Sequence, residues 1–211
     1  MKIQPDSWPI RFLTRVCDLF LLNVVFMFAC VTVVCSGTAM TALYSVTLRM
    51  LRGETNTPVK DFFRSIRNNF IPCFPATILL FVDVTLIAFL LTVLFAEELL
   101  ISPTLFVALA IAGLLLTALL SWLFPLLARF ENTFPRHLGN AVLLAAANLP
   151  VTFLITLVNL LPILLALALP ELLGYLAAFW TFIGLAAGAY LNSFYLNRVF
   201  GLKKEEVETD E

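Results

Sequence analysis

The sequence predicts an all-α fold: a polytopic membrane helical bundle with five full spans, one short membrane-embedded helix and cytoplasmic amphipathic helices. Of its 211 residues, 61% are hydrophobic and only 13% are charged, and the mean hydropathy is +0.99. This composition lies far outside that of soluble domains. Four long runs also contain no Asp, Glu, Lys or Arg, and each exceeds the roughly 20 residues that cross a bilayer. These runs are 19–48, 99–128, 138–170 and 172–197.

The charge balance excludes two classes of protein. Thirteen basic residues against fourteen acidic residues give a formal charge of −1, which is not the strongly basic balance of a nucleic-acid binder. The mass of 23.5 kDa leaves little chain outside the bilayer for a soluble catalytic domain. We therefore expect the lipid bilayer, and no nucleic acid, as a partner.

The first apolar run is predicted to form a helix over about 16–35, a turn at Ser36-Gly37 and a short helix over 38–52. With this arrangement all 13 basic residues face the cytoplasm, as the positive-inside rule favours. A single crossing would place Lys2, Arg11 and Arg15 outside. The short helix spans only about 25 Å at 1.5 Å per residue, so whether it crosses the bilayer fully stays open.

An amphipathic helix is predicted over 58–70, between the second and third membrane segments. Thr57 is its expected N-cap, and Pro58 occupies the first helical position. Lys60, Arg64 and Arg67 lie opposite an apolar stripe with helical spacing. This basic interfacial helix fits the cytoplasmic headgroup region, where it binds either anionic lipid or a partner protein.

The remaining elements follow from the other apolar runs. We expect one membrane domain over 1–201 and a disordered cytoplasmic tail over 202–211. The connectors near Glu97-Glu98 and Glu171 lack Lys and Arg, so they are the outer ones, and both termini are cytoplasmic in a bacterial cell membrane. The predicted spans are 72–96, 103–128, 150–170 and 172–198, with a second interfacial helix over 135–149.

Asp83 stands out because it is an acid inside an apolar span. It follows Pro72 by 11 residues, which places it near the bilayer centre. Burying a carboxylate there costs at least about 2.5 kcal/mol, so protonation, a water-filled cavity or hydrogen bonds must compensate. The group either handles a substrate, ion or proton, or ties helices together. The candidate partners are Asn23, Tyr44, Thr85 and Asn159.

Two further patterns lie on predicted membrane helices. Thr41, Tyr44 and Ser45 share one face of the short helix, which we expect to point into the bundle, towards Asp83 or a polar cavity. A stripe of small residues on the last span permits close packing, either within this chain or in a homodimer or with a partner subunit. The stripe consists of Gly174, Ala177, Thr181, Gly184 and Gly188.

No pattern of catalytic residues is present in the sequence. His137 is the single histidine and has no second metal ligand or nucleophile at a useful spacing. The four cysteines lack metal-ligand spacing, and neither a Walker A loop nor GxGxxG occurs. We therefore expect no enzyme, no metal and no cofactor.

Four segments resemble a known family: DLFLLN at 18–23, SGTAMTALYSVTLRMLRGE at 36–54, DFFRSIRNNF at 61–70 and NAVLLAAANLP at 140–150. Together they resemble the YesL-like family of bacterial membrane proteins, a domain family of unknown function. The most specific matches are Gly37, Arg52, Gly53, Glu54, Asp61 and Phe62. The resemblance implies a small protein of the cytoplasmic membrane, often encoded beside carbohydrate-uptake ABC transporters and glycan-degrading enzymes.

Three functions are therefore considered. The first is a membrane accessory or assembly subunit of a carbohydrate ABC-type importer, with the permease subunits as partners. The second is a stand-alone small-solute carrier or channel that uses Asp83. The third is a membrane scaffold or sensor.

Overall fold

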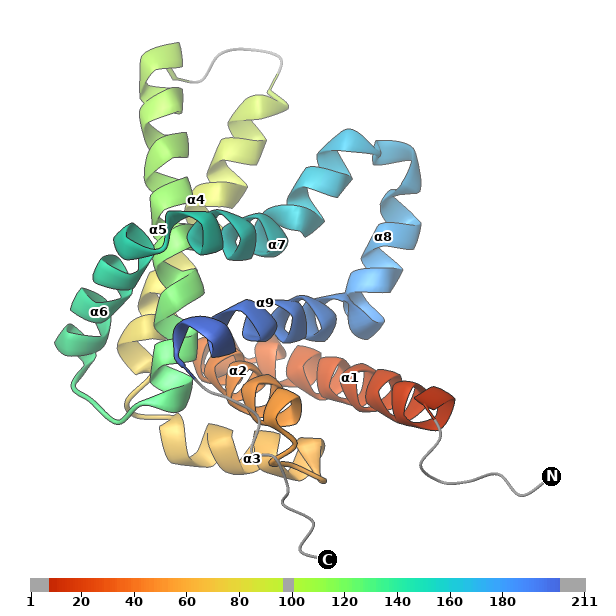
Figure 1. The fold of residues 1–211 in the computed structure, drawn as a ribbon. Coiled ribbons are helices and arrows are strands. Elements are labelled where there is room, and N and C mark those ends of the chain that lie inside the picture. The colour runs from red at the N-terminus through yellow and green to blue at the C-terminus, as the bar shows by residue number, and fades with distance from the viewer. Residues whose placement is uncertain (1–7, 97–100, 202–211) are drawn as a thin grey trace, which may run out of the picture.

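The computed structural model describes residues 8–96 and 101–201, and within these ranges the chain is helical with no β-strand (Figure 1). The predicted disordered tail over 202–211 and the Glu97-Glu98 connector lie outside the described residues. Five of the described helices are long and apolar enough to cross a membrane. The structure is therefore an all-α membrane helical bundle.

The helices follow one another with short connections. The long helices are α1 (Trp8–Val31), α2 (Ser36–Arg52), α3 (Pro58–Asn69), α4 (Phe74–Leu94), α5 (Pro103–Arg129), α6 (Phe134–Ala147), α7 (Leu149–Ala168) and α9 (Leu185–Val199). The short elements are η1 (Val33–Cys35), η2 (Pro170–Leu172), α8 (Leu173–Phe179) and the π-helix η3 (Trp180–Gly184). In Figure 1, α4 and α5 stand as an upright pair, and α1, α2 and α9 gather below α7.

The first helix begins and ends earlier than the predicted 16–35. It starts at Trp8 and stops at Val31, and the chain then turns through η1 before α2 begins at Ser36. Thr32 adopts an extended conformation, with φ −87° and ψ 102°, and its hydroxyl donates to the Ala29 carbonyl at 3.0 Å. β-branched residues fill this stretch, and their poor helix propensity ends α1 four residues before the predicted boundary.

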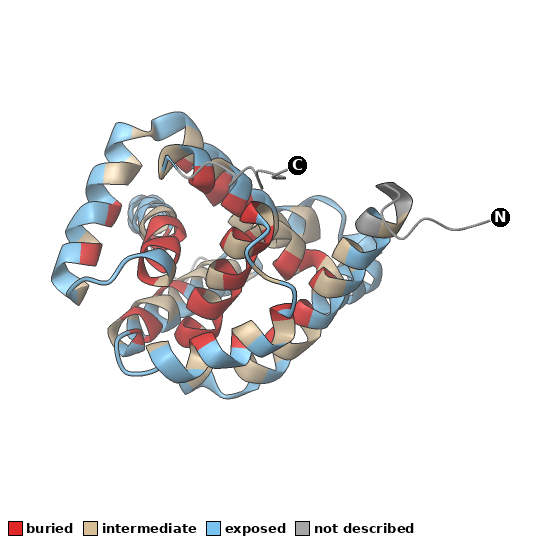
Figure 2. Ribbon diagram, turned by 60° about the horizontal axis from the view of Figure 1, so that its bottom comes forward, coloured by how far each residue is buried: buried red, intermediate tan, exposed pale blue. Residues whose placement is uncertain are grey.

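The short helix α2 lies at the centre of the molecule, where Figure 2 shows that the buried residues gather. Most of its residues are buried, and it contacts α1, α3, α4, α5 and α9. Gly37 permits the close approach of α4, because a Cβ atom there would lie 2.5 Å from Thr77 Oγ1 and 2.8 Å from Thr77 Cα. This helix is therefore a core element rather than an isolated span.

The end of α2 is held by a set of polar contacts that we call the Arg52 clasp, made of Arg52, Glu54 and Asn197. The Arg52 guanidinium donates two hydrogen bonds to the Glu54 carboxylate, one of them at 2.7 Å, and a third to Asn197 Oδ1 at 3.3 Å. Gly53 makes the tight turn between the first two residues at φ +79°, a conformation that glycine adopts without strain. The clasp therefore joins α2 to α9.

The predicted last span over 172–198 is not one regular helix. It is divided into η2, α8, the π-helix η3 and α9. The Asn23 side chain compensates for the break: its amide donates to the carbonyls of Trp180 and Thr181 at 3.1 and 2.6 Å, and its oxygen accepts from Ala186 N–H at 2.7 Å. π-helices occur often at functional sites, so the residues around this one are candidates for a functional site.

Candidate functional site

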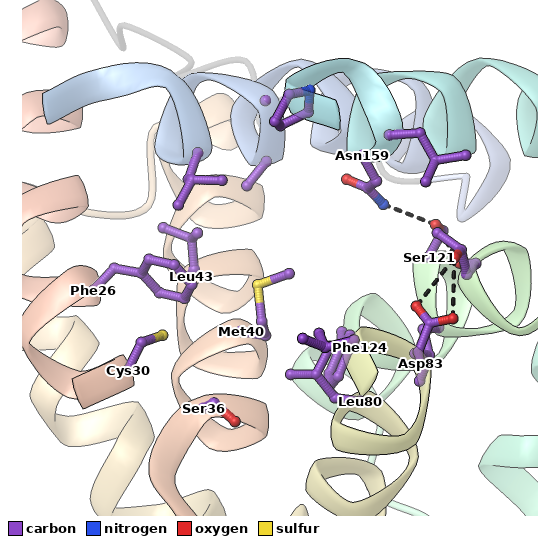
Figure 3. A pocket seen from close by; sticks show the side chains of 18 of the residues that line it. Phe26, Cys30, Ser36, Met40, Leu43, Leu80, Asp83, Ser121, Phe124 and Asn159 are labelled. Atoms are coloured by element: carbon purple, nitrogen blue, oxygen red, sulfur yellow. Dashed lines mark hydrogen bonds between the residues drawn. The ribbon is translucent and has the colours of Figure 1, made fainter. Parts of the chain in front are cut away.

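The candidate site is a cavity of about 490 Å³ enclosed by α1, α2, α4, α5, α7, η3 and α9. Figure 3 shows Asp83, Ser121 and Asn159 grouped on one side of it, with Phe26 and Leu43 on the opposite side. The cavity therefore has one polar wall and a largely apolar remainder.

Asp83 belongs to this polar wall. Its side chain is buried, at 4% exposure, and it lies near the middle of α4. The Thr117 hydroxyl on α5 lies 3.0 Å from Oδ2 and 3.2 Å from Oδ1. The same hydroxyl lies 3.0 Å from the Gly113 carbonyl, and it has a single hydrogen for all three acceptors. The Asp83 carboxyl group is therefore only weakly satisfied by the protein.

A chain of polar groups extends from Thr117 across the molecule. Ser121 donates to the Thr117 carbonyl at 2.7 Å and accepts from Asn159 Nδ2 at 2.8 Å. Asn192 Nδ2 then lies 2.9 Å from Asn159 Oδ1 and 3.2 Å from Tyr44 Oη. This Asp83 network joins α4, α5, α7, α9 and α2, and it fixes the polar wall of the cavity.

Trp180 lines the same cavity from the π-helix. Its Nε1 atom is buried and has no hydrogen-bond partner. The indole lies directly over Gly184, since a Cβ atom there would collide with the ring. Because Asn23 holds the π-helix through two hydrogen bonds to its backbone, this indole is fixed in place with a free donor.

The mouth of the cavity is apolar. Val33, Phe81 and Val84 line the cavity and are each 56% exposed. Val84 is next to Asp83 in the middle of α4, one of the helices apolar enough to cross a membrane. The exposed residues that line the cavity therefore lie beside Asp83, in the middle of a helix that is apolar enough to cross a membrane.

Only some of the polar residues that the sequence singled out line the cavity. Asp83, Tyr44 and Asn159 line the cavity, whereas Asn23 supports the π-helix behind it. Thr41 bonds instead to the Gly37 carbonyl and accepts from Cys73 Sγ at 3.3 Å, and half-buried Ser45 lies away from the cavity. The shared face of Thr41, Tyr44 and Ser45 therefore does not point as a unit towards Asp83.

The hydrogen-bond partner of Asp83 is Thr117, which is not among the four candidates Asn23, Tyr44, Thr85 and Asn159. Thr117 contacts the carboxyl group, whereas Thr85 on the same helix is exposed. Asn159 reaches it only through Ser121 and Thr117. Thr117, Ser121 and Trp180 were missed, because small hydroxyl residues and a tryptophan are ordinary in a span, and the sequence gives their depth but not the rotation of their helices.

The stripe of small residues does not make a single packing face within the described chain. Gly188 approaches Val158 of α7, and Gly184 makes room for Trp180 of its own helical segment. Gly174, Ala177 and Thr181 are exposed. The π-helix shifts the helical register between the two halves of the stripe, which a regular period of 3.6 residues does not anticipate.

The basic interfacial helix corresponds to α3. Phe62 is fully buried against the core, whereas Lys60, Arg64 and Arg67 are exposed. Thr57 makes no side-chain cap, so the expected capping bond is absent. Asp61 instead accepts a hydrogen bond from Thr55 and lies 3.7 Å from Arg49, so this family-motif acid closes the connection between α2 and α3.

His137 lies on α6, where its side chain is 2% exposed and its Nδ1 atom has no partner. Burial lowers the pKa of the imidazole, which favours its neutral form. Over the described ranges, no three His, Cys, Asp or Glu side chains lie close enough together to hold a metal ion.

One family comparison bears on this site. Residues 19–95 match the model of the family described as a protein of unknown function, DUF624. The match confirms the resemblance to the YesL-like family over this part of the chain. The DUF624 segment contains Asp83, Tyr44, Arg52 and Glu54. Thr117, Asn159 and Trp180 lie beyond it. No curated protein and no solved structure matches the chain.

Proposed function

We propose that this protein binds a small solute inside the membrane and acts as a carrier for it, with Asp83 as the polar anchor of the site. The observation that supports this proposal is the position of Asp83, a buried acid in mid-span that lines a cavity of about 490 Å³. Acids within transmembrane segments are costly and usually serve function. Cavities of about 300 to 1,000 Å³ with few polar groups are typical of small-molecule sites.

The proposal includes location and orientation. We place the chain in a bacterial cytoplasmic membrane with both termini inside, because every Lys and Arg then lies on the cytoplasmic side. Arg49, Arg52 and Arg198 fit this arrangement, since they lie in the last turns of α2 and α9. The proposed role is a non-enzymatic one.

The proposal is tested by identifying small molecules that remain bound to the protein purified in detergent. Mass spectrometry is applied to the wild type and to Asp83→Asn, which keeps the shape of the side chain and removes its charge. We expect a molecule enriched in the wild type and reduced at least about tenfold in the variant, because the polar anchor is lost. Asp18→Asn is the matched control, since Asp18 lies on α1 away from the cavity.

A second variant separates binding from a general disturbance of the fold. Val84→Trp fills the mouth of the cavity from an exposed position, so it leaves the core packing intact while blocking entry. The carrier proposal requires that this variant also lose the bound molecule. Equal retention by the wild type, Asp83→Asn and Val84→Trp would contradict it.

A second function, that of an accessory or assembly subunit for a carbohydrate ABC-type importer, is favoured by the exposed face of α3. Phe63 is 56% exposed and lines a shallow hollow with Arg64 and Arg67. Aromatic residues and Arg are enriched at protein–protein interfaces relative to the rest of the surface. The chain has no nucleotide-binding motif of its own, so a transport ATPase would have to supply the energy.

Purification from the native membrane tests this second function. We expect permease or ATPase subunits to accompany the wild type and to be lost from the double variant Arg64→Glu and Arg67→Glu. Arg136→Glu, an exposed change on α6, is the control for altered charge. Recovery of the chain alone from native membranes would exclude a stable accessory subunit.

A further inference from the structure

We infer that the cavity takes an amphipathic organic cation from the lipid phase, with a protonated amine on Asp83 and an apolar body against the remaining walls. This inference rests on the proposed function and names its class of solute. It follows from three features of the cavity: its charge, its opening and its unpaired donor.

The charge of the cavity has one sign. Asp83 is an acid, and no Lys, Arg or His is among the described residues that line the cavity. The protein offers this carboxyl group only the shared hydrogen of Thr117. A buried carboxylate without a cation is strongly unfavourable, so a ligand that brings a positive charge gains the interaction that the protein leaves unmade.

The opening of the cavity sets the remaining chemistry of the ligand. Phe81 and Val84 flank Asp83 closely on α4 and are both exposed at the mouth. A ligand therefore reaches Asp83 sideways, through an apolar entrance at the depth of the bilayer interior. A sugar would have to leave water for this entrance with its hydroxyl groups unpaired, whereas an alkylamine already resides in the lipid.

Trp180 supplies a second means of recognition. Its indole is held over Gly184 by the π-helix and lines the same cavity as Asp83. The face of an indole attracts ammonium groups, and its unpartnered Nε1–H can bond to an acceptor on the ligand. On α7, Pro162 has no N–H to give to the Val158 carbonyl, and both residues line the cavity. The Val158 carbonyl is therefore a candidate acceptor for an ammonium group.

The inference is tested by direct binding of two probes that share an alkyl chain. Radiolabelled decylamine, which is protonated at pH 7, and decanol are titrated onto the full chain in phosphatidylcholine nanodiscs, with empty nanodiscs subtracted. We expect decylamine to bind the wild type at least about tenfold more tightly than decanol. We expect Asp83→Asn to lose this preference and Asp18→Asn to keep it.

The outcomes separate the class of solute from the proposed function. If decylamine and decanol bind equally and Val84→Trp abolishes both, the cavity binds solutes but the inferred cation is wrong. If Val84→Trp changes neither probe, the cavity is not the binding site and both proposals fail. Retention of the decylamine preference in a folded Asp83→Asn protein would also overturn the inference.

Discussion

The Arg52 clasp and the cavity around Asp83 use buried polar groups in opposite ways. In the clasp, the Arg52 guanidinium donates to both Glu54 and Asn197. In the cavity, Asp83 shares one hydroxyl hydrogen with a backbone carbonyl, and the indole nitrogen of Trp180 has no partner. Arg52, Glu54 and Asp83 belong to the DUF624 segment, whereas Asn197, Thr117 and Trp180 lie beyond it, so each region joins this segment to the rest of the chain.

This contrast separates stability from binding. A buried polar group that is fully paired holds the fold, and its loss leaves its partners unsatisfied. A buried polar group that is poorly paired costs stability and retains its capacity to bind something else. We therefore expect substitutions in the clasp to unfold the protein and substitutions in the cavity to leave it folded.

The largest effect is expected for Arg52→Ala. This change removes the hydrogen bonds to Glu54 and Asn197 and frees α9 from the end of α2. We expect the free energy of unfolding to fall by about 2 to 3 kcal/mol, measured by denaturant titration in mixed micelles. The exposed Arg64→Ala on α3 is the control, with a change within about 0.5 kcal/mol. Equal stabilities for the two variants would show that the clasp does not stabilise the fold.

Gly37→Ala tests the packing beside the clasp. The new methyl group would lie 2.5 Å from Thr77 Oγ1 and 2.8 Å from Thr77 Cα, so α2 and α4 must move apart. We expect a loss of about 1 to 3 kcal/mol. Gly139→Ala is the matched control, because nothing lies within 4 Å of a Cβ there. A thermal unfolding midpoint as high as that of the control would show that the two helices have room to spare.

The pH dependence of stability tests the contribution of the Glu54 carboxylate to the clasp. The hydrogen bonds from Arg52 lower the pKa of the Glu54 carboxyl group, which lies in the connection after α2. A carboxyl group with a lowered pKa in the folded state stabilises the fold above its ordinary pKa of about 4.3. That contribution is lost as the pH falls through the folded pKa. Thermal midpoints of Glu54→Gln should therefore fall less steeply than those of the wild type as the pH is lowered from about 5 towards acid unfolding.

The smallest effect on stability is expected for Trp180→Phe. The indole nitrogen of Trp180 has no partner, whereas Trp122 Nε1 donates to Thr152 Oγ1 at 2.9 Å. Trp122→Phe should therefore cost about 1 kcal/mol more than Trp180→Phe, measured by the same denaturant titration. A larger cost for Trp180→Phe would show that this indole stabilises the fold, and that its N–H group is not a donor reserved for a ligand.

The sequence predicted the features that depend on composition along one helix. The apolar helices, the amphipathic α3 and the placement of Asp83 in mid-span all follow from local spacing and length. The contact between Asp83 and Thr117 does not, because it depends on how α4 and α5 rotate against each other. The π-helix was also beyond prediction, since the Asn23 side chain that supports its backbone lies more than 150 residues earlier in the chain.

We propose that Asp83 serves binding rather than stability, and thermal unfolding with and without decylamine tests this most directly. A ligand at 100 times its Kd stabilises the folded state by about 2.7 kcal/mol. We predict that decylamine raises the unfolding midpoint of the wild type, and that Asp83→Asn starts at an equal or higher midpoint and shows no rise. An equal rise in both proteins, or an Asp83→Asn protein as unstable as Arg52→Ala, would contradict the account.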